Sequence, residues 1–227
     1  PGARGRGTGG ALALRATDTD TALTAWSHGH HPGAAALARR LGFDAVRDLW
    51  VMRRSLTDLP TADPVAGAGA APADGIEIRA FEVGRDEEGF LRVNAEAFAD
   101  HPEQGDLTRE GLAERMAEPW FDPAGFFVAT RGPHDEVVGF HWTKVHDDTP
   151  PSGEVYVVGV SPSAQGGGLG RRLTLAGLHH LADRGLAEAL LYVEADNAAA
   201  VAVYRRLGFQ HAAADTHVQY ARGPRRR

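Results

Sequence analysis

One stretch constrains the fold of this chain more than any other. It runs from Glu154 to Arg172 and reads EVYVVGVSPSAQGGGLGRR. Its first part, Glu154 to Val160, is short and rich in β-branched residues, which favours a strand over a helix. Three consecutive glycines, Gly166 to Gly168, follow. Apolar residues then recur at helical spacing from Leu169 to Leu181, so a strand leads through a glycine-rich turn into a helix.

This turn has the physical properties of an anion site. A helix start leaves its first backbone N–H groups without partners, and the macrodipole adds partial positive charge there. Glycine lets the backbone approach a ligand closely and adopt positive φ, and the combination suits phosphate. The turn is not a Walker motif, because no Lys-Ser or Lys-Thr follows the last glycine, and it breaks the G-x-G-x-x-G pattern of dinucleotide folds. A connection that binds no ligand is the alternative.

A second copy of the same element order precedes this stretch. Arg4-x-x-Gly7-x-Gly9 matches Gln165-x-x-Gly168-x-Gly170, and both copies later contain Arg-Arg-Leu-Gly-Phe, at 39–43 and 205–209. This similarity indicates a tandem duplication. We therefore expect residues 1–56 to be the C-terminal half of a first repeat, without the groups for chemistry. We expect this half either to pack on the second repeat or to be poorly ordered.

The other boundaries follow from composition and periodicity. Residues 57–75 are rich in Pro, Gly and Ala and lack an apolar period, which predicts a linker. We expect the complete second repeat at 76–222 and a basic tail at 223–227. The patterns predict strands near 24–27, 45–53, 76–81, 126–130, 137–145, 154–160, 190–194 and 217–221, and helices at 32–41, 86–99, 107–116, 169–184 and 198–207.

The element order and the motif Gln165-x-x-Gly168-x-Gly170 resemble those of the GNAT acetyltransferases over residues 76–222. The resemblance implies the GNAT fold, an α/β fold with a mixed sheet, and acetyl-CoA as cosubstrate with its pyrophosphate in the turn. It also implies that the strand carrying Val158 splays from its neighbour and offers backbone N–H groups to the thioester. The residues that it assigns to the cosubstrate are Val158, Gly159, Val160, Gln165, Gly166, Gly167, Gly168, Leu169, Gly170, Arg171, Ala199 and Tyr204.

Acetyl transfer from a thioester to an amine needs a base for the amine and an acid for the leaving thiolate. Glu154 opens the strand from which this family draws its base, and we assign that role to it. The two-residue period of a strand predicts that Glu154 shares a face with Tyr156 and Val158. Tyr204 matches the tyrosine with which the family commonly protonates coenzyme A. An exposed carboxylate and a core tyrosine are the alternative interpretations.

Three features together resemble the mycothiol synthase family: the tandem arrangement, the polar turn His101 to Asp106, and the strand from Glu154. That family acetylates the cysteinyl amine of a cysteine–glucosamine–inositol precursor. The resemblance implies that Lys144 and Glu194 hold the sugar–inositol part and that His101 belongs to a turn that closes over the acceptor. Acetylation of another small amine or a protein N-terminus, or a non-catalytic acyl-CoA-binding module, are the alternatives.

Composition limits the other classes of function. Of the 227 residues, 43% are hydrophobic and 24% charged, as in ordinary globular proteins, and a net charge of −6 implies no general affinity for nucleic acid. The chain has no cysteine and therefore no thiolate metal site. His28, His30 and His31 lie in the incomplete first copy, and His179 and His180 face different directions on a helix. No further carboxylate or histidine is spaced to complete either set, so we expect no metal. We expect a cytoplasmic monomer that contacts no membrane, cut from a longer protein because the chain starts at Pro1.

Overall fold

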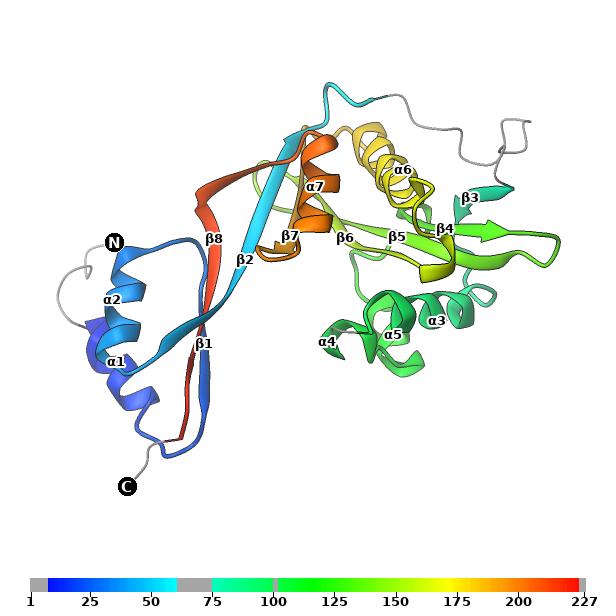
Figure 1. Cartoon of the computed structure of the whole chain (residues 1–227). Helices are drawn as coiled ribbons and strands as arrows, with labels where there is room; N and C mark the ends of the chain where they lie inside the picture. Colours follow the sequence, from blue (N-terminus) through cyan, green and yellow to red (C-terminus); the bar gives the residue numbers. More distant parts are fainter. Residues whose placement is uncertain (1–7, 61–74, 100–101, 225–227) are drawn as a thin grey trace. The chain divides into compact units, whose positions relative to one another are not determined.

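A computed structural model describes residues 8–60, 75–99 and 102–224 (Figure 1). The helices are α1 (Thr8–Ala16), α2 (Pro32–Arg40), α3 (Glu87–Ala97), α4 (Pro102–Gly105), α5 (Arg109–Met116), α6 (Leu169–Asp183) and α7 (Ala198–Arg206), with 3₁₀ turns η1 (Pro123–Gly125) and η2 (Pro162–Ala164). The strands are β1 (Leu23–Ser27), β2 (Asp44–Ser55), β3 (Ile76–Ala80), β4 (Phe126–Arg131), β5 (Glu136–His146), β6 (Ser152–Val160), β7 (Glu188–Glu194) and β8 (Gln210–Arg222).

The chain forms two compact units. One is Arg53–Leu191, which we call the central unit. The other, the terminal unit, combines Pro1–Met52 with Tyr192–Arg227. The units therefore do not follow the repeat boundaries drawn from sequence similarity, which remain a prediction about the origin of the chain.

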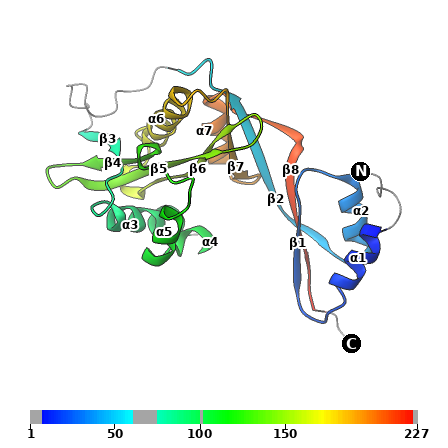
Figure 2. The ribbon, with the colours of Figure 1, turned by 180° about the vertical axis from the view of Figure 1, so that it is seen from behind.

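The central unit is built on one mixed sheet. β3, β4, β5 and β6 are joined in that order by antiparallel ladders, and β7 pairs with β6 in parallel. Helices α3 and α5 lie on one face of the sheet and α6 lies on the other (Figures 1 and 2). Burial of apolar area on both faces stabilises this arrangement. The cluster toward α3 includes Phe90, Phe126, Phe140 and Trp142, and the cluster toward α6 includes Ile78, Phe127, Leu169 and Leu173.

A β-bulge divides the β5–β6 ladder. Val157 lies opposite Trp142, but Val155 lies opposite Thr143, so Tyr156 is the extra residue on β6. A bulge of this kind interrupts the alternation of side chains along the strand. Tyr156 packs against the aromatic cluster toward α3, whereas Val158 packs against the cluster toward α6. The prediction that Glu154, Tyr156 and Val158 share one face of the strand was therefore wrong for Val158, which lies on the opposite face from Tyr156.

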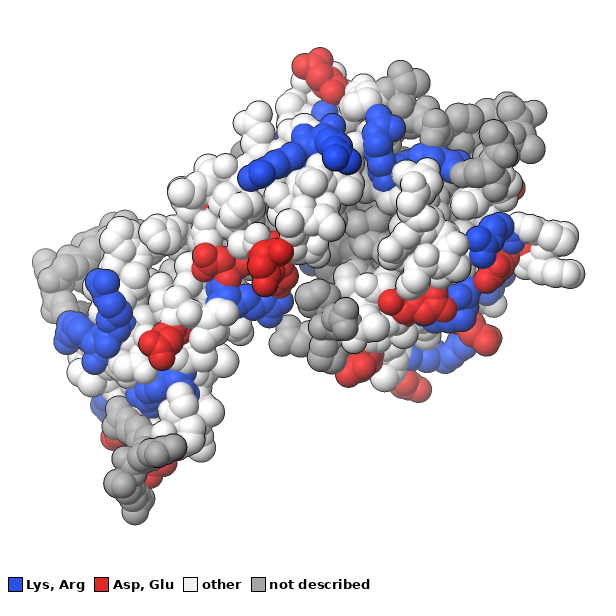
Figure 3. Space-filling model, viewed as in Figure 1, with Lys and Arg blue, Asp and Glu red and all other residues white. Residues whose placement is uncertain are grey.

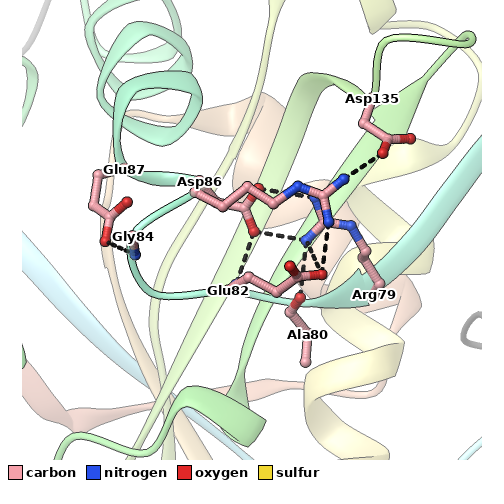
Figure 4. A network of polar contacts seen from close by, with 8 residues as sticks. Arg79, Ala80, Glu82, Gly84, Asp86, Glu87 and Asp135 are labelled. Atoms are coloured by element: carbon pink, nitrogen blue, oxygen red, sulfur yellow. Dashed lines mark hydrogen bonds and ion pairs between the residues drawn. The ribbon is translucent and has the colours of Figure 1, made fainter.

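Charged side chains of both signs occupy the face shown in Figure 3. A network of charged side chains lies at the start of α3 (Figure 4). Arg79 donates two hydrogen bonds, of 2.6 and 2.8 Å, to the carboxylate of Asp86, which also accepts the backbone N–H of Glu82. Burial acts to raise the pKa of Asp86, but the hydrogen bonds from Arg79 and Glu82 outweigh it and lower that pKa.

In the terminal unit, β1 pairs with β8 in an antiparallel ladder from Leu23↔Arg222 to Ser27↔Val218. Helices α1 and α2 lie on the same side of this pair in both ribbon views (Figures 1 and 2). Arg222 fastens the ladder further by donating hydrogen bonds to the carbonyls of Leu41 and Thr17. The described part of the first segment thus pairs with a strand from residues 76–222.

Most predicted helices and strands are observed within a few residues of their expected ends. The largest differences are β8, which begins at Gln210 rather than near 217, and α4, which the sequence patterns did not predict as a helix. Within the described residues, no helix is both long and apolar enough to cross a membrane.

Candidate functional site

The glycine-rich turn adopts the backbone that its sequence predicted. Gly166 has φ of 90° and Gly168 has φ of 77°, in the left-handed region that favours glycine. A Cβ placed on Gly166, Gly167 or Gly168 would have no described atom within 4 Å. The turn is exposed, and it therefore leaves room for a ligand to approach its backbone directly.

The start of α6 presents free backbone donors. Gly168 is the N-cap and provides no side-chain cap, and the first helical hydrogen bond runs from Arg172 N to Gly168 O at 3.1 Å. The N–H groups of Leu169, Gly170 and Arg171 precede that bond, as expected of a helix N-terminus. The first turn of α6 contains no acidic residue. Together with the macrodipole, these donors form a site suited to an anion.

The edge of β6 beside this turn also carries oriented backbone groups. Ser161 N donates to Val138 O at 2.9 Å, in register with the β5–β6 ladder. Because bonding directions alternate along an antiparallel strand, Gly159 points its N–H toward β5, and Val158 and Val160 point theirs toward the opposite edge. The carbonyl of Val160 accepts a bond from the Gln165 side chain at 3.3 Å, consistent with this direction.

Within the central unit, the parallel ladder between β6 and β7 joins Gly153 to Ala189 and Glu154 to Leu190. Among the described residues of this unit, the ladder does not continue to Val155. Gly159, further along, packs closely: a Cβ there would lie 2.7 Å from the Phe140 ring and 3.2 Å from Ala97. The glycine therefore makes room for the aromatic cluster beneath the strand.

Glu154 is a buried carboxylate with a defined partner. Its side chain is 9% exposed, and His146 Nε2 lies 2.6 Å from its Oε2. Across the ladder it faces Lys144 on β5. The ammonium of Lys144, however, lies 4.5 Å from the ring centre of Trp120 and 5.7 Å from that of Tyr156. Within the described residues it forms no ion pair with Glu154.

Glu194, at the end of β7, belongs to the terminal unit and is also paired. Arg47 on β2 donates from Nε to Glu194 Oε1 at 2.6 Å and forms a second contact through Nη2. The Arg47 guanidinium lies 5.8 Å from the ring centre of Trp26. Arg47 carries no motif that would mark it in the sequence, because its role depends on β2 lying next to β7.

Tyr204 and Ala199 lie on α7, also in the terminal unit. Burial raises the pKa of the Tyr204 phenol to about 12. Its hydroxyl makes no hydrogen bond within the described residues, and its ring contacts Phe209 edge to face. Ala199 is exposed in the first turn, just after Asn197, which caps the helix by accepting Ala200 N at 3.0 Å.

Two expectations concern other positions. His101 lies outside the described residues. The described part of the chain contains no group of three or more side chains placed to hold a metal ion. Of the predicted site residues, Glu154, Lys144 and the β6–α6 turn belong to the central unit, and Tyr204, Ala199 and Glu194 belong to the terminal unit.

Comparisons with known proteins agree on the kind of protein. A family model described as "Acetyltransferase (GNAT) family" matches residues 91–209, just over half of the chain. A mycothiol acetyltransferase from Nocardioides sp. is 56% identical, over 98% of this chain and 78% of its own length. Another from Catenulispora acidiphila is 53% identical, over 96% of this chain and 69% of its own length.

Solved structures show the same fold. A GCN5-related N-acetyltransferase from Sphaerobacter thermophilus superposes with a TM-score of 0.76 at 24% identity, over all of this chain and 71% of its own length. A tandem GNAT protein from the clavulanic acid biosynthesis pathway gives a TM-score of 0.72 at 22% identity, over all of this chain and 73% of its own length. At these identities the likeness concerns the fold alone.

Proposed function

Because the chain belongs to the GNAT acetyltransferase family, we propose that it transfers the acetyl group of acetyl-CoA to the cysteinyl amine of the cysteine–glucosamine–inositol precursor of mycothiol. The acceptor is proposed from the relatives, which are named mycothiol acetyltransferases and share more than half of their aligned residues with this chain. We place the reaction in the cytoplasm.

The observation that carries the transferase proposal is the β6–α6 segment. The exposed glycine turn and the free N–H groups at the start of α6 suit a pyrophosphate. In this proposal Gln165 to Arg171 hold the pyrophosphate of acetyl-CoA, and Ala199 contacts the same molecule. The outward-pointing N–H groups of Val158 and Val160 then hydrogen-bond the thioester oxygen and the pantetheine amides, which stabilises negative charge on that oxygen.

The proposed reaction needs one base and one acid. Glu154 removes a proton from the acceptor ammonium, and the freed lone pair forms a C–N bond to the thioester carbon. The C–S bond breaks, the departing thiolate takes the proton of the Tyr204 hydroxyl, and the acylated nitrogen loses its second proton to solvent. Burial keeps the Tyr204 phenol protonated at neutral pH, and the raised pKa makes it a weaker acid than an ordinary phenol. Solvent then accepts the proton held by Glu154 and restores that of Tyr204.

Acceptor recognition is proposed for Lys144, Glu194 and His101. Lys144 carries a cation near the base, held beside two aromatic rings. Glu194 offers a carboxylate that its contact with Arg47 orients. Both types of group hydrogen-bond the hydroxyls of a sugar or an inositol.

The direct test is product formation. The protein is incubated with acetyl-CoA and the cysteinyl pseudodisaccharide, an amino sugar, or a peptide with a free N-terminus, and product and free thiol are measured by mass spectrometry and a thiol assay. Turnover with the pseudodisaccharide is expected to exceed that with the other amines. A preference for another amine would show that this amine, and not the cysteinyl pseudodisaccharide, is the acceptor. Binding of acetyl-CoA without thiol release would favour a non-catalytic module.

Glu154→Gln tests the base. Loss of a general base is expected to lower kcat about 10²-fold or more while acetyl-CoA affinity is kept. Glu77→Gln is the matched control, because Glu77 is an exposed carboxylate on β3, and it should behave as the wild type. Unaltered activity of Glu154→Gln at neutral pH would remove this residue from the mechanism.

A further inference from the structure

The last residue of β5, His146, lies beside the proposed base. In the β5–β6 ladder Lys144 is opposite Glu154 and His146 is opposite Ser152. Residues two apart on a strand share a face, so Glu154 has His146 as its diagonal neighbour. The bulge at Tyr156 shifts the register by one residue and creates this arrangement. In the unshifted register Glu154 would face Val145 instead.

The chemistry of the two groups fixes the direction of the hydrogen bond between them. An ionised carboxylate can only accept, so the imidazole must donate its Nε2–H to Glu154 Oε2 at 2.6 Å. A charge-assisted bond of this length is among the stronger hydrogen bonds in proteins. It also fixes the rotamer of a long side chain that would otherwise be free to rotate.

The bond leaves the other carboxylate oxygen available. Within the described residues Oε1 of Glu154 has no hydrogen-bond partner, and it is not among the polar atoms that are sealed from solvent without a partner. Lys144, the charged residue opposite, is turned toward Trp120 and Tyr156, and the β7 neighbour is the apolar Leu190. One oxygen of Glu154 is thus held in place while the other can meet an amine.

We propose that His146 is a positioning residue for Glu154: its Nε2–H holds Oε2 so that Oε1 points to the acceptor nitrogen and takes the proton. This inference rests on the proposed function, since it assigns a partner to the base of that reaction. His146 itself does not touch the substrate in this arrangement. Its contribution is orientation of the base, which should affect the chemical step more than cosubstrate binding.

Two substitutions of His146 separate the hydrogen bond from other effects. In His146→Asn the amide is too short to reach Glu154, whereas in His146→Gln the amide nitrogen can occupy the position of Nε2. We expect His146→Asn to lower kcat roughly 10-fold with the KM for acetyl-CoA unchanged, and His146→Gln to recover most of the lost activity. His134→Gln, an exposed histidine in the β4–β5 turn, is the matched control and should match the wild type.

Circular dichroism and thermal unfolding of each variant establish that it is folded. If His146→Asn does not fold, His146→Gln compared with His146→Phe provides the same contrast. Wild-type kcat in a folded variant without the donor would overturn the inference, and so would an equal loss of activity in the Gln variant. A wild-type protein that acetylates no amine would instead overturn the proposed function, so the two failures are distinguishable.

Discussion

At the scale of the residue, His141 shows how burial sets the charge of a side chain. It lies on β5 directly beneath α6, fully buried, and donates its Nδ1–H to the carbonyl of Leu173 at 2.8 Å. Its Nε2 is buried without a partner among the described residues. Burial lowers the pKa of His141 to about 4, because this surrounding cannot solvate an imidazolium.

This shift makes stability depend on pH. The pKa of His141 is lower in the folded than in the unfolded chain, where it is about 6.5, so its contribution is complete above pH ~6.5 and is lost as the pH falls toward ~4. The expected loss is about 3 kcal/mol. Urea unfolding of the wild type and of His141→Asn at several pH values measures it. The Asn variant should be less stable at neutral pH but should lose less stability on acidification.

His134→Asn is the control for that comparison, because His134 is exposed in a turn. It should follow the wild type at every pH. Parallel pH dependence in the wild type and His141→Asn would show that another group causes the acid sensitivity. His180, whose pKa burial also lowers, is the first alternative.

The sequence predicted some of these residues and not others for a physical reason. Glu154 and Tyr204 were predicted as site residues because each stands at a fixed place in a recognisable motif. His141 and His146 lie on a strand whose existence was predicted, but their roles depend on what lies opposite. The burial of His141 under α6 and the contact of His146 with Glu154 depend on how β5 is aligned with its neighbours. The residue pattern of one strand does not specify that register.

At the scale of the element, the turn before α6 separates two effects of a glycine substitution. Gly168 and Gly132 both have positive φ, of 77° and 74°, and a Cβ at either would meet no described atom within 4 Å. Substitution of either glycine by alanine should therefore lower the free energy of unfolding by about 1 kcal/mol through backbone strain. Only Gly168 lies at the proposed pyrophosphate site.

Gly168→Ala is therefore expected to weaken acetyl-CoA binding about 10-fold or more, because the added Cβ and the altered φ obstruct the backbone donors. Gly132→Ala should lower thermal stability by a similar amount and leave affinity unchanged. Calorimetric titration with acetyl-CoA measures both. Equal affinity in the two variants would mean that the turn does not hold the cosubstrate.

The bulge on β6 marks the limit of prediction for elements. The strand, the turn and the helix were each predicted at nearly their observed ends from valine content, glycine position and apolar spacing. The extra residue at Tyr156 was not predicted, because the residues before it and the residues after it each follow the two-residue period of a regular strand. That single insertion sends Val158 to the α6 face and brings Lys144 opposite Glu154.

At the scale of the whole molecule, the predicted repeats rest on sequence similarity while the compact units are defined by contacts. The strand β1 comes from the predicted first repeat and β8 from the predicted second, yet they form one ladder inside the terminal unit. Two segments far apart in the sequence thus contribute strands to one ladder. Sequence similarity predicts two copies, but it does not tell which strands pair.

Such pairing predicts that the two segments stay together without a covalent link. A protease site inserted within residues 61–74 allows the chain to be cut, and the pieces should still co-elute in size-exclusion chromatography. The β1–β8 ladder, the pairing of β2 with β8, and the bonds from Arg222 to Leu41 and Thr17 are expected to hold them. Independent folding of each repeat would instead give two separate peaks.

Proline at two adjacent positions of β1 supplies an internal control for this experiment. Only alternate residues of the edge strand donate N–H groups to β8, so of Thr24→Pro and Ala25→Pro one removes a ladder bond and the other removes an outward N–H. After cleavage, one variant should release its N-terminal piece much more readily than the other. Equal behaviour of the two would show that the pieces are held by something other than this ladder.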